Sequence, residues 1–187
     1  VDISCVAAYA AEVQIRWSYL QAPETGDAYS HYYWGIDDVT ISENPVADDL
    51  SVVQVTNGDV YNVFEYRVTP LEQAIPEADG GLLAGVLYRN AGNADQDETE
   101  ITVEILDDAG QVLSTTTENI GTVFSFANAA ICPANSQDTV YIATGWTPTE
   151  VGNYVVQATI GSANEDVAPE DNVMSKVVVY SDDEYGH

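Results

Sequence analysis

Carboxylates are the most abundant side chains in this chain that could do chemistry. Acidic residues outnumber basic residues 31 to 4, and the formal net charge is -27. Between Asn164 and Asn172, Asp166 and Asp171 lie close to amide side chains. Oxygen ligands at this density could bind calcium, although the stretch lacks the DxDxDG spacing of a calcium-binding loop. The alternative is a solvated acidic surface whose self-repulsion is screened by salt.

Histidine is scarce, which argues against an enzyme. The two histidines are His31 and His187, and neither lies in an HExxH pattern. A Ser-His-Asp arrangement would depend on His31 alone. Paired carboxylates are so common here that residue type neither supports nor excludes a glycosidase pair. We therefore expect no catalytic residue in this chain.

Aromatic residues form a candidate contact surface. Positions 29 to 34 hold four of them: Tyr29, Tyr32, Tyr33 and Trp34. Sugars and protein partners both use exposed Tyr and Trp faces, but such rings beside a strand usually fill a core. A second candidate surface is the apolar stretch that contains Phe124 and Phe126. It would be a docking patch if it were exposed, and a cap on the sandwich if it folded back.

Composition also limits the partners. Nucleic-acid phosphates would repel a surface of this charge, so we expect no nucleic-acid partner. No apolar run reaches the roughly 18 residues of a membrane helix, so we expect no membrane insertion. Cys5 and Cys132 have no CxxC spacing. They could form a disulfide outside the cytoplasm, and two separately buried thiols fit equally well.

These side chains must be positioned by strands. The first two strand patterns in the sequence lie in residues 1–44. Apolar and polar residues alternate from Val13 to Tyr19, as in a half-buried strand. A second strand pattern covers residues 32–41. Because an isolated hairpin is marginal in water, two strands alone cannot bury these aromatic side chains. We expect the missing layer to come from residues ahead of Val1, from the second domain or from another chain.

Residues 45–181 predict a second unit, an all-β sandwich. Pro45 ends the preceding strand, and no amphipathic helix pattern follows. Short strands recur between turn residues, as in sandwich folds. The predicted strands cover residues 50–55, 60–68, 82–88, 99–106, 111–117, 139–144, 153–160 and 175–180. We expect Gly110 to take a positive φ in the turn at 107–110. Residues 182–187 are interpreted as a linker or tail.

The segment Trp34-Gly35-Ile36-Asp37-Asp38-Val39-Thr40-Ile41 resembles the last strand of jelly-roll modules of the MAM-like and cleaved-adhesin type. Such modules are common in large surface proteins and secreted proteases of Bacteroidota. The resemblance implies that residues 1–44 are the C-terminal strands of a jelly-roll module. Several of these modules bind calcium near this strand, which implies Asp37 and Asp38 as calcium ligands. Alternatively, one aspartate satisfies backbone donors at a bulge.

Three features of the second unit occur together in order. They are Leu87-Tyr88-Arg89-Asn90-Ala91-Gly92, Trp146-Thr147-Pro148 followed by Gly152-Asn153-Tyr154, and Glu170-Asp171-Asn172-Val173 before the last strand. With them, residues 47–181 resemble a bacterial immunoglobulin-like domain of the CARDB type. The apolar stretch between Thr122 and Asp138 departs from that family. The resemblance implies an Ig-like β-sandwich with an adhesion-related role, and it implies no required metal in the loop before the last strand.

We interpret the chain as a non-catalytic adhesion, binding or spacer segment of a large secreted or cell-surface bacterial protein. Its expected partners are neighbouring domains of the same longer polypeptide and a surface protein or glycan. Calcium is the cofactor expected. Two other interpretations stay open: an accessory region of a secreted hydrolase acting on peptides or polysaccharides, and a surface filament subunit completed by strand donation.

Overall fold

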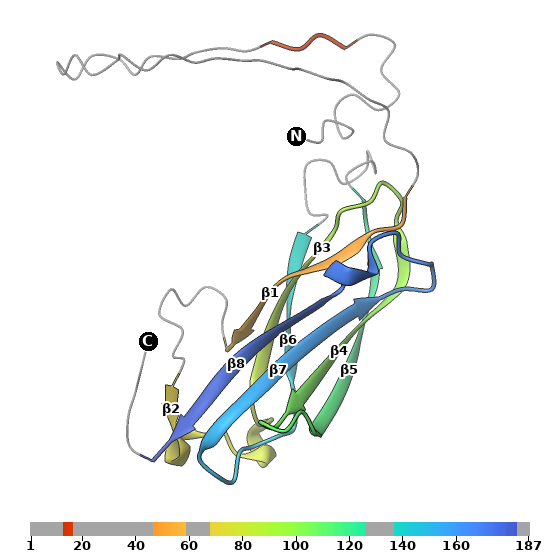
Figure 1. Ribbon diagram of the computed structural model, residues 1–187. Coiled ribbons are helices and arrows are strands. Elements are labelled where there is room, and N and C mark those ends of the chain that lie inside the picture. The colour runs from red at the N-terminus through yellow and green to blue at the C-terminus, as the bar shows by residue number, and fades with distance from the viewer. Residues whose placement is uncertain (1–12, 17–46, 59–67, 126–136, 183–187) are drawn as a thin grey trace, which may run out of the picture.

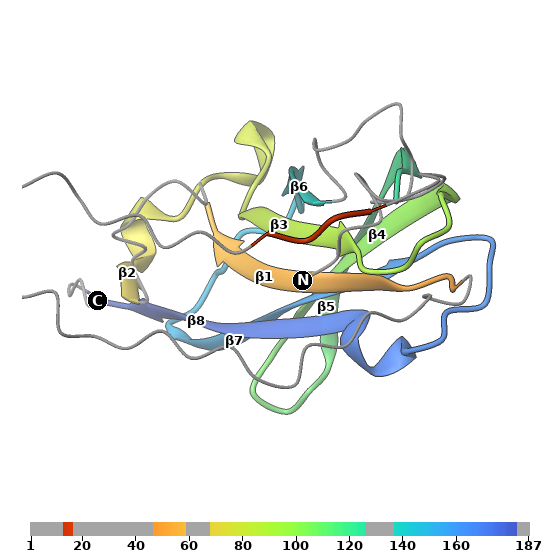
Figure 2. The same cartoon turned by 90° about the horizontal axis from the view of Figure 1, so that it is seen from above.

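A computed structural model describes residues 13–16, 47–58, 68–125 and 137–182 (Figure 1). From Ala47 onward, the described residues form eight strands in two packed sheets. Figure 2 shows the layers from above, with β1 and β3 in one and β8 and β7 in the other. The fold class predicted from the sequence, an all-β Ig-like sandwich, is confirmed.

The smaller sheet has three antiparallel strands in the order β1-β3-β6. They are β1 (Leu50–Asn57), β3 (Leu83–Asn90) and β6 (Gln137–Ala143). The nearly continuous apolar sequence of β3 suits a central strand. Four of its first six residues are buried: Ala84, Gly85, Val86 and Tyr88. The register between β1 and β3 shifts between Val52 and Gln54, and Val53 is left exposed on the bulge.

The larger sheet has five strands in the order β2-β8-β7-β4-β5. They are β2 (Val68–Pro70), β8 (Val173–Ser181), β7 (Gly152–Gly161), β4 (Gln96–Leu106) and β5 (Val112–Val123). All neighbours are antiparallel except β2 and β8. Three single-turn 3-10 helices connect strands: η1 (Leu71–Gln73), η2 (Glu77–Asp79) and η3 (Pro169–Asp171). No helix in the described part of the chain is long and apolar enough to cross a membrane.

The core lies between the two sheets and follows the two-residue alternation of the strands. In β4, Ile101, Val103 and Ile105 are at most 1% exposed, while Thr102 and Glu104 lie on the outer face. The facing sheet contributes a matching set: Leu50, Val52, Val55, Ala84, Val86, Tyr88 and Ile142. Burial of each large apolar side chain contributes roughly 1.5–3 kcal/mol. This contact between inner faces holds the sheets together.

The chain enters and leaves the sandwich at opposite ends (Figure 1). At the entry end, Ala47 lies beside the loop after β3, where Asn93 N donates to Ala47 O at 3.1 Å. At the exit end, Ser181 pairs with Pro70 of β2. β1 and β8 run in the same direction between these ends. A nine-residue strand such as β8 spans about 30 Å.

Most strand positions predicted for residues 45–181 agree with the structure. The patterns at 82–88, 99–106, 139–144, 153–160 and 175–180 correspond to β3, β4, β6, β7 and β8. The predicted turn is confirmed: Gly110 has a φ of 76°, and Asp107 Oδ1 accepts hydrogen bonds from Ala109 N and Gln111 N at 2.9 and 2.8 Å. The end predicted for the next strand, residue 117, is wrong, because β5 continues to Val123 as an exposed polar edge strand.

The expectations for residues 1–44 are tested only at positions 13–16. There the strand prediction is wrong: the four residues have no regular secondary structure, and Val13 and Ile15 are 47% and 39% exposed. No strand among the described residues pairs with them. The second strand pattern, Cys5, Cys132 and most of the strand predicted at 60–68 lie outside the described residues. The jelly-roll assignment of residues 1–44 therefore stays a prediction.

Three aromatic rings close the exit end of the core. Trp146 packs edge to face against Tyr154 with ring centroids 4.8 Å apart, and Tyr180 lies 6.4 and 6.0 Å from these two rings. Trp146 O also accepts a hydrogen bond from Leu82 N at 2.8 Å. A side chain on Gly81 would collide with the Trp146 backbone. The two halves of one feature that carried the family resemblance, Trp146-Thr147-Pro148 and Gly152-Asn153-Tyr154, thus meet in one cluster.

We predict that Trp146→Ala lowers the free energy of unfolding by about 2–4 kcal/mol, because it removes the central ring of this cluster and leaves a cavity. Urea denaturation followed by circular dichroism measures the change. The matched control is Val167→Ala, which truncates a side chain that is 64% exposed and should stay within about 0.5 kcal/mol of the original chain. Equal effects of the two variants would contradict this role for Trp146.

Candidate functional site

The entry segment, residues 47–50, is held on one side by the loop after β3. Ala47 N donates to Asn93 Oδ1 at 2.7 Å, and the amides of Ala91 and Gly92 donate to Asp49 O at 2.8 and 3.1 Å. Gly92 is required at this close approach, since a Cβ there would meet the backbone of Ala47 and Asp49. The turn residues at 90–93 therefore have a specific task. They hold the chain by hydrogen bonds where it enters the sandwich.

On its other side, the entry segment is held by the loop between β7 and β8. Val167 N donates to Asp48 O at 2.9 Å, and Asn164 Nδ2 donates to Asp48 Oδ1 at 3.0 Å. Gln96 Nε2 reaches the same Oδ1 at 2.5 Å. Gln96 is 1% exposed and also accepts a hydrogen bond from Ser162 Oγ at 2.7 Å. These bonds join both loops to the entry segment.

Asp166 makes the bond that ties the first strand to this second loop. Its Oδ2 accepts a hydrogen bond from Leu50 N at 2.8 Å, and its Oδ1 accepts one from Ala168 N at 2.8 Å. Leu50 is 1% exposed, so its amide would lack a partner without this carboxylate. Hydrogen bonds to a carboxylate are stronger than those between neutral groups. Asp166, singled out from the sequence as a calcium ligand, therefore has a structural role.

Two further carboxylates lie close to Asp166, each with a buried oxygen that has no hydrogen-bond partner. These oxygens are Asp49 Oδ1 and Asp171 Oδ1. Burial raises the pKa of Asp49, and repulsion from Asp171 and Asp166 adds to the effect. Burial likewise raises the pKa of Asp171, with repulsion from Asp166 as the next cause. Arg89 opposes both shifts. We call Asp49, Asp166 and Asp171 the acidic clamp.

The acidic clamp falls short of a calcium cage on its own. Calcium takes six to eight oxygen ligands, whereas both oxygens of Asp166 already accept backbone hydrogen bonds. Across the described ranges, no group of three or more His, Cys, Asp or Glu side chains is arranged to hold a metal ion. The structure brings Asp166 and Asp171 close enough to interact electrostatically. Calcium binding by this pair stays a prediction.

The other residues singled out from the sequence are mostly not described. Those outside the described residues are Tyr29, Tyr32, Tyr33, Trp34, Asp37, Asp38 and Phe126. Phe124 is described: it follows the end of β5 and is 40% exposed. The apolar stretch therefore begins with an accessible ring. Whether it forms a docking surface stays a prediction.

Sequence reasoning missed Asp48 and Asp49. They lie directly before the first apolar strand, which is a usual place for solvated turn residues. Their partners are far away in the sequence, since Asp48 and Asn164 are separated by 116 positions. The one signal in the sequence was that two acidic residues, Asp48 and Asp49, are adjacent. Only the fold shows that they meet the loop before β8.

Comparisons with known proteins give distant likenesses. No family model matches the chain, and no curated protein matches it. The solved structures similar to it include a CARDB domain from Pyrococcus furiosus in complex with di-metal ions, 17% identical, with a TM-score of 0.47 over 78% of this chain and 100% of that one. A domain of a putative cell surface protein from Methanosarcina acetivorans is 16% identical, with a TM-score of 0.44 over 76% and 99%.

The first of these neighbours bears the same family name as the resemblance drawn from residues 47–181. Likenesses at these identities and TM-scores are too distant to carry an argument about function. The preceding jelly-roll module and the Bacteroidota source stay predictions. Function must therefore be argued from the geometry of the sandwich.

We predict that Asp49→Asn raises the free energy of unfolding at neutral pH. A group whose pKa is higher in the folded than in the unfolded chain stabilises the fold fully below its unfolded pKa, and this stabilisation is lost as pH rises through the folded pKa. Asparagine mimics the protonated acid, so the variant keeps this stabilisation at all pH values. The difference between variant and original chain should thus be largest near pH 7 and shrink towards pH 4, as measured by urea denaturation across pH.

The control is Asp108→Asn, which removes the same charge from the exposed turn at the exit end. It should give a smaller gain at neutral pH, because only general repulsion is relieved. If Asp108→Asn stabilises the chain as much as Asp49→Asn does, the acidic clamp has no special electrostatic cost and our interpretation is wrong.

Proposed function

We propose that this sandwich is a rigid spacer and binding module, carried in series with other domains of a large secreted or cell-surface protein. The observation that carries the proposal is the position of the two ends: the chain enters at Ala47 and leaves at Ser181 at opposite ends of the sandwich (Figure 1). Each such module adds its full length, about 30 Å, to the distance between its neighbours.

Tension along such a polypeptide would act along the terminal strands. β1, pulled at Leu50, would have to slide against β3, with which it pairs through Asn57. β8, pulled at Ser181, would have to slide against β7 along its length and against β2 at its last three residues. Sliding loads many ladder hydrogen bonds at once, whereas peeling breaks them in turn. The geometry suits a module that transmits force.

The hydrogen bonds of the entry segment support the same function. Residues 47–50 are bonded to the loop after β3, a strand of the smaller sheet, and to the loop between β7 and β8 of the larger sheet. Force applied ahead of Ala47 would therefore be shared between both sheets. An untied first strand would instead be loaded through its own ladder alone.

The location, the adhesion role and the partners belong to the proposal. An excess of 31 acidic over 4 basic residues suits a salty or calcium-containing exterior, where self-repulsion is screened. The sequence resemblance to bacterial adhesion-related modules points the same way. The partners we propose are flanking domains of the same polypeptide and a surface protein or glycan. The module would serve the same spacing role beside a secreted hydrolase, and we assign it no catalysis.

We predict that the sandwich resists force better along its long axis than at one end. Pulling between residues 47 and 182 loads the terminal strands in shear, whereas pulling between residues 47 and 93 peels β1 from β3. Single-molecule force spectroscopy on the chain, with cysteines at these positions and Cys5 and Cys132 replaced by serine, measures both rupture forces. The end-to-end geometry should give the higher rupture force, because it loads the ladder hydrogen bonds together whereas peeling breaks them one after another. Unfolding under load depends on the height of this barrier.

Gly92→Ala tests the entry segment separately. The added methyl group displaces Ala47 and Asp49, so the end-to-end force should fall. The control is Gly161→Ala, where an added methyl group meets no atom within 4 Å. Equal forces in the two pulling geometries would refute the spacer proposal. An unchanged force in Gly92→Ala would refute the role of the entry segment.

We also propose calcium as the cofactor, bound at Asp37 and Asp38 or with Asp171. Millimolar calcium should raise the melting temperature more than sodium chloride of matched ionic strength, since only a site in the folded state gives stabilisation by mass action, about 2.7 kcal/mol at 100 times Kd. Two variants locate the site: the double variant Asp37→Asn with Asp38→Asn, and the single variant Asp171→Asn. The calcium-specific rise in melting temperature should disappear in the variant that has lost the calcium ligands. Equal rises with both salts would refute calcium binding.

A further inference from the structure

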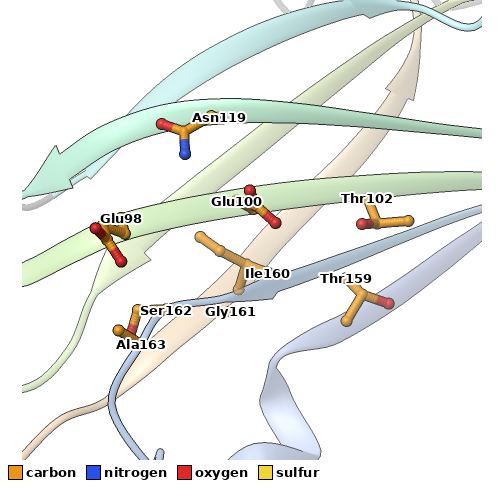
Figure 3. Close-up of a pocket in the computed structure, with 9 residues that line it drawn as sticks. All are labelled: Glu98, Glu100, Thr102, Asn119, Thr159, Ile160, Gly161, Ser162 and Ala163. Atoms are coloured by element: carbon orange, nitrogen blue, oxygen red, sulfur yellow. The ribbon is translucent and has the colours of Figure 1, made fainter.

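The outer face of the five-stranded sheet has a hollow near its entry end, shown in Figure 3. Its volume is about 580 Å³, and it is open to solvent on one side. Three neighbouring strands, β4, β5 and β7, supply its walls. The side chains that matter for its chemistry are Glu98, Glu100, Thr102, Asn119 and Thr159. None of them belongs to the acidic clamp.

A missing side chain creates the hollow. Gly161 pairs directly with Glu100 in the ladder between β7 and β4, and Glu100 pairs with Asn119 on its other side. At Gly161, the last residue of β7, the outer face has no side chain, and a Cβ there would meet no atom within 4 Å. The wall residues therefore surround an open space. Strand geometry at Gly161 does not itself require a glycine, since its φ is not in the left-handed region.

A backbone irregularity brings a second carboxylate to the same place. The register of β4 with β5 shifts between Gln96 and Thr99, and within this bulge Glu98 has a φ of 52°. It is the one non-glycine residue with a positive φ in the described part of the chain. That conformation is costly for a residue with a side chain. Because of this irregularity, Glu98 and Glu100 both line the hollow (Figure 3).

The walls present hydrogen-bond acceptors almost throughout. The carboxylates of Glu98 and Glu100 make no hydrogen bond or ion pair with the described residues, so four carboxylate oxygens are available. Thr102 and Thr117 share a hydrogen bond of 3.0 Å between their hydroxyls. Asn119 Oδ1 accepts a bond from Gly121 N at 3.0 Å, which leaves its amide group as a donor. A complementary ligand must be positively charged and must donate hydrogen bonds.

The size of the hollow favours an organic cation over a bare metal ion. Small-molecule pockets have volumes of roughly 300–1,000 Å³, whereas one water occupies about 30 Å³. We infer that this hollow binds a small organic cation with an ammonium group, with Glu98 and Glu100 as its counter-charges. A polyamine, an amino sugar unit of a glycan and a free basic amino acid share this chemistry. The inference does not depend on the spacer role, because it concerns a lateral face and not the ends.

The test is a calorimetric titration of the whole chain at about 150 mM salt, where general attraction to the acidic surface is screened. The probes are spermidine, glucosamine and lysine, and the neutral comparison is N-acetylglucosamine. We expect at least one ammonium probe to bind one to one and N-acetylglucosamine to bind at least tenfold more weakly. The probe that binds best identifies the source of the ammonium group.

Four variants assign the binding to this hollow. Glu98→Gln and Glu100→Gln should each weaken binding about tenfold, because each removes a charge-assisted hydrogen bond. Glu104→Gln removes an equal charge from the same face of β4, two positions beyond Thr102, and should weaken it less than twofold. Gly161→Val should abolish binding while the melting temperature stays close to that of the original chain, because valine fits a strand and fills the hollow.

Glu98→Gly provides a readout that a purely structural role would not give. Glycine adopts a positive φ without strain, so the variant should melt at a higher temperature and yet bind more weakly. The inference is overturned if glucosamine and N-acetylglucosamine bind equally, if Glu104→Gln weakens binding as much as Glu100→Gln, or if Gly161→Val still binds. It is also overturned if calcium binds this hollow one to one and excludes every ammonium probe.

Discussion

The position of the first strand depends on one of several hydrogen bonds that link the two sheets, the bond from Leu50 N to Asp166 Oδ2. β1 belongs to the smaller sheet, whereas Asp166 lies in the loop that joins β7 and β8 of the larger sheet. Apolar contacts between the inner faces hold the layers together but give little direction. The charged acceptor fixes where β1 begins, and with it the register of β1 on β3. The bonds to Asp48 and Asp49 reinforce that position.

This tie has an electrostatic cost that the chain retains. Burial raises the pKa of Asp49 and of Asp171, repulsion from Asp166 adds to both shifts, and each residue keeps a buried oxygen without a partner. Arg89 offsets part of the repulsion while its Nε donates to Ser51 Oγ at 3.0 Å. A neutral acceptor at position 166 would avoid the repulsion but would hold the Leu50 amide less tightly. Fixing the entry segment therefore takes precedence over electrostatic stability.

The sequence predicted those features that depend on neighbouring residues. The apolar run of β3, the alternation of β4 and the turn at Asp107 to Gly110 are local signals, and each corresponds to an observed element. The full length of β5 was missed, because a polar edge strand needs only one paired side and carries no apolar alternation. The acidic clamp and the hollow depend on registers between distant strands. Asp49 and Gly161 were visible in the sequence, but their partners were not.

The two ends of the sandwich differ in chemistry, and this bears on how modules could be joined. The exit end is closed by the rings of Trp146, Tyr154 and Tyr180, whose packing responds little to salt or pH in the neutral range. The entry end is held by carboxylates, whose interactions respond to both. In the proposed series of domains, changes in the surroundings would therefore alter the coupling to a preceding domain before they alter the coupling to a following one. Under that proposal, the orientation of the chain decides which junction is responsive.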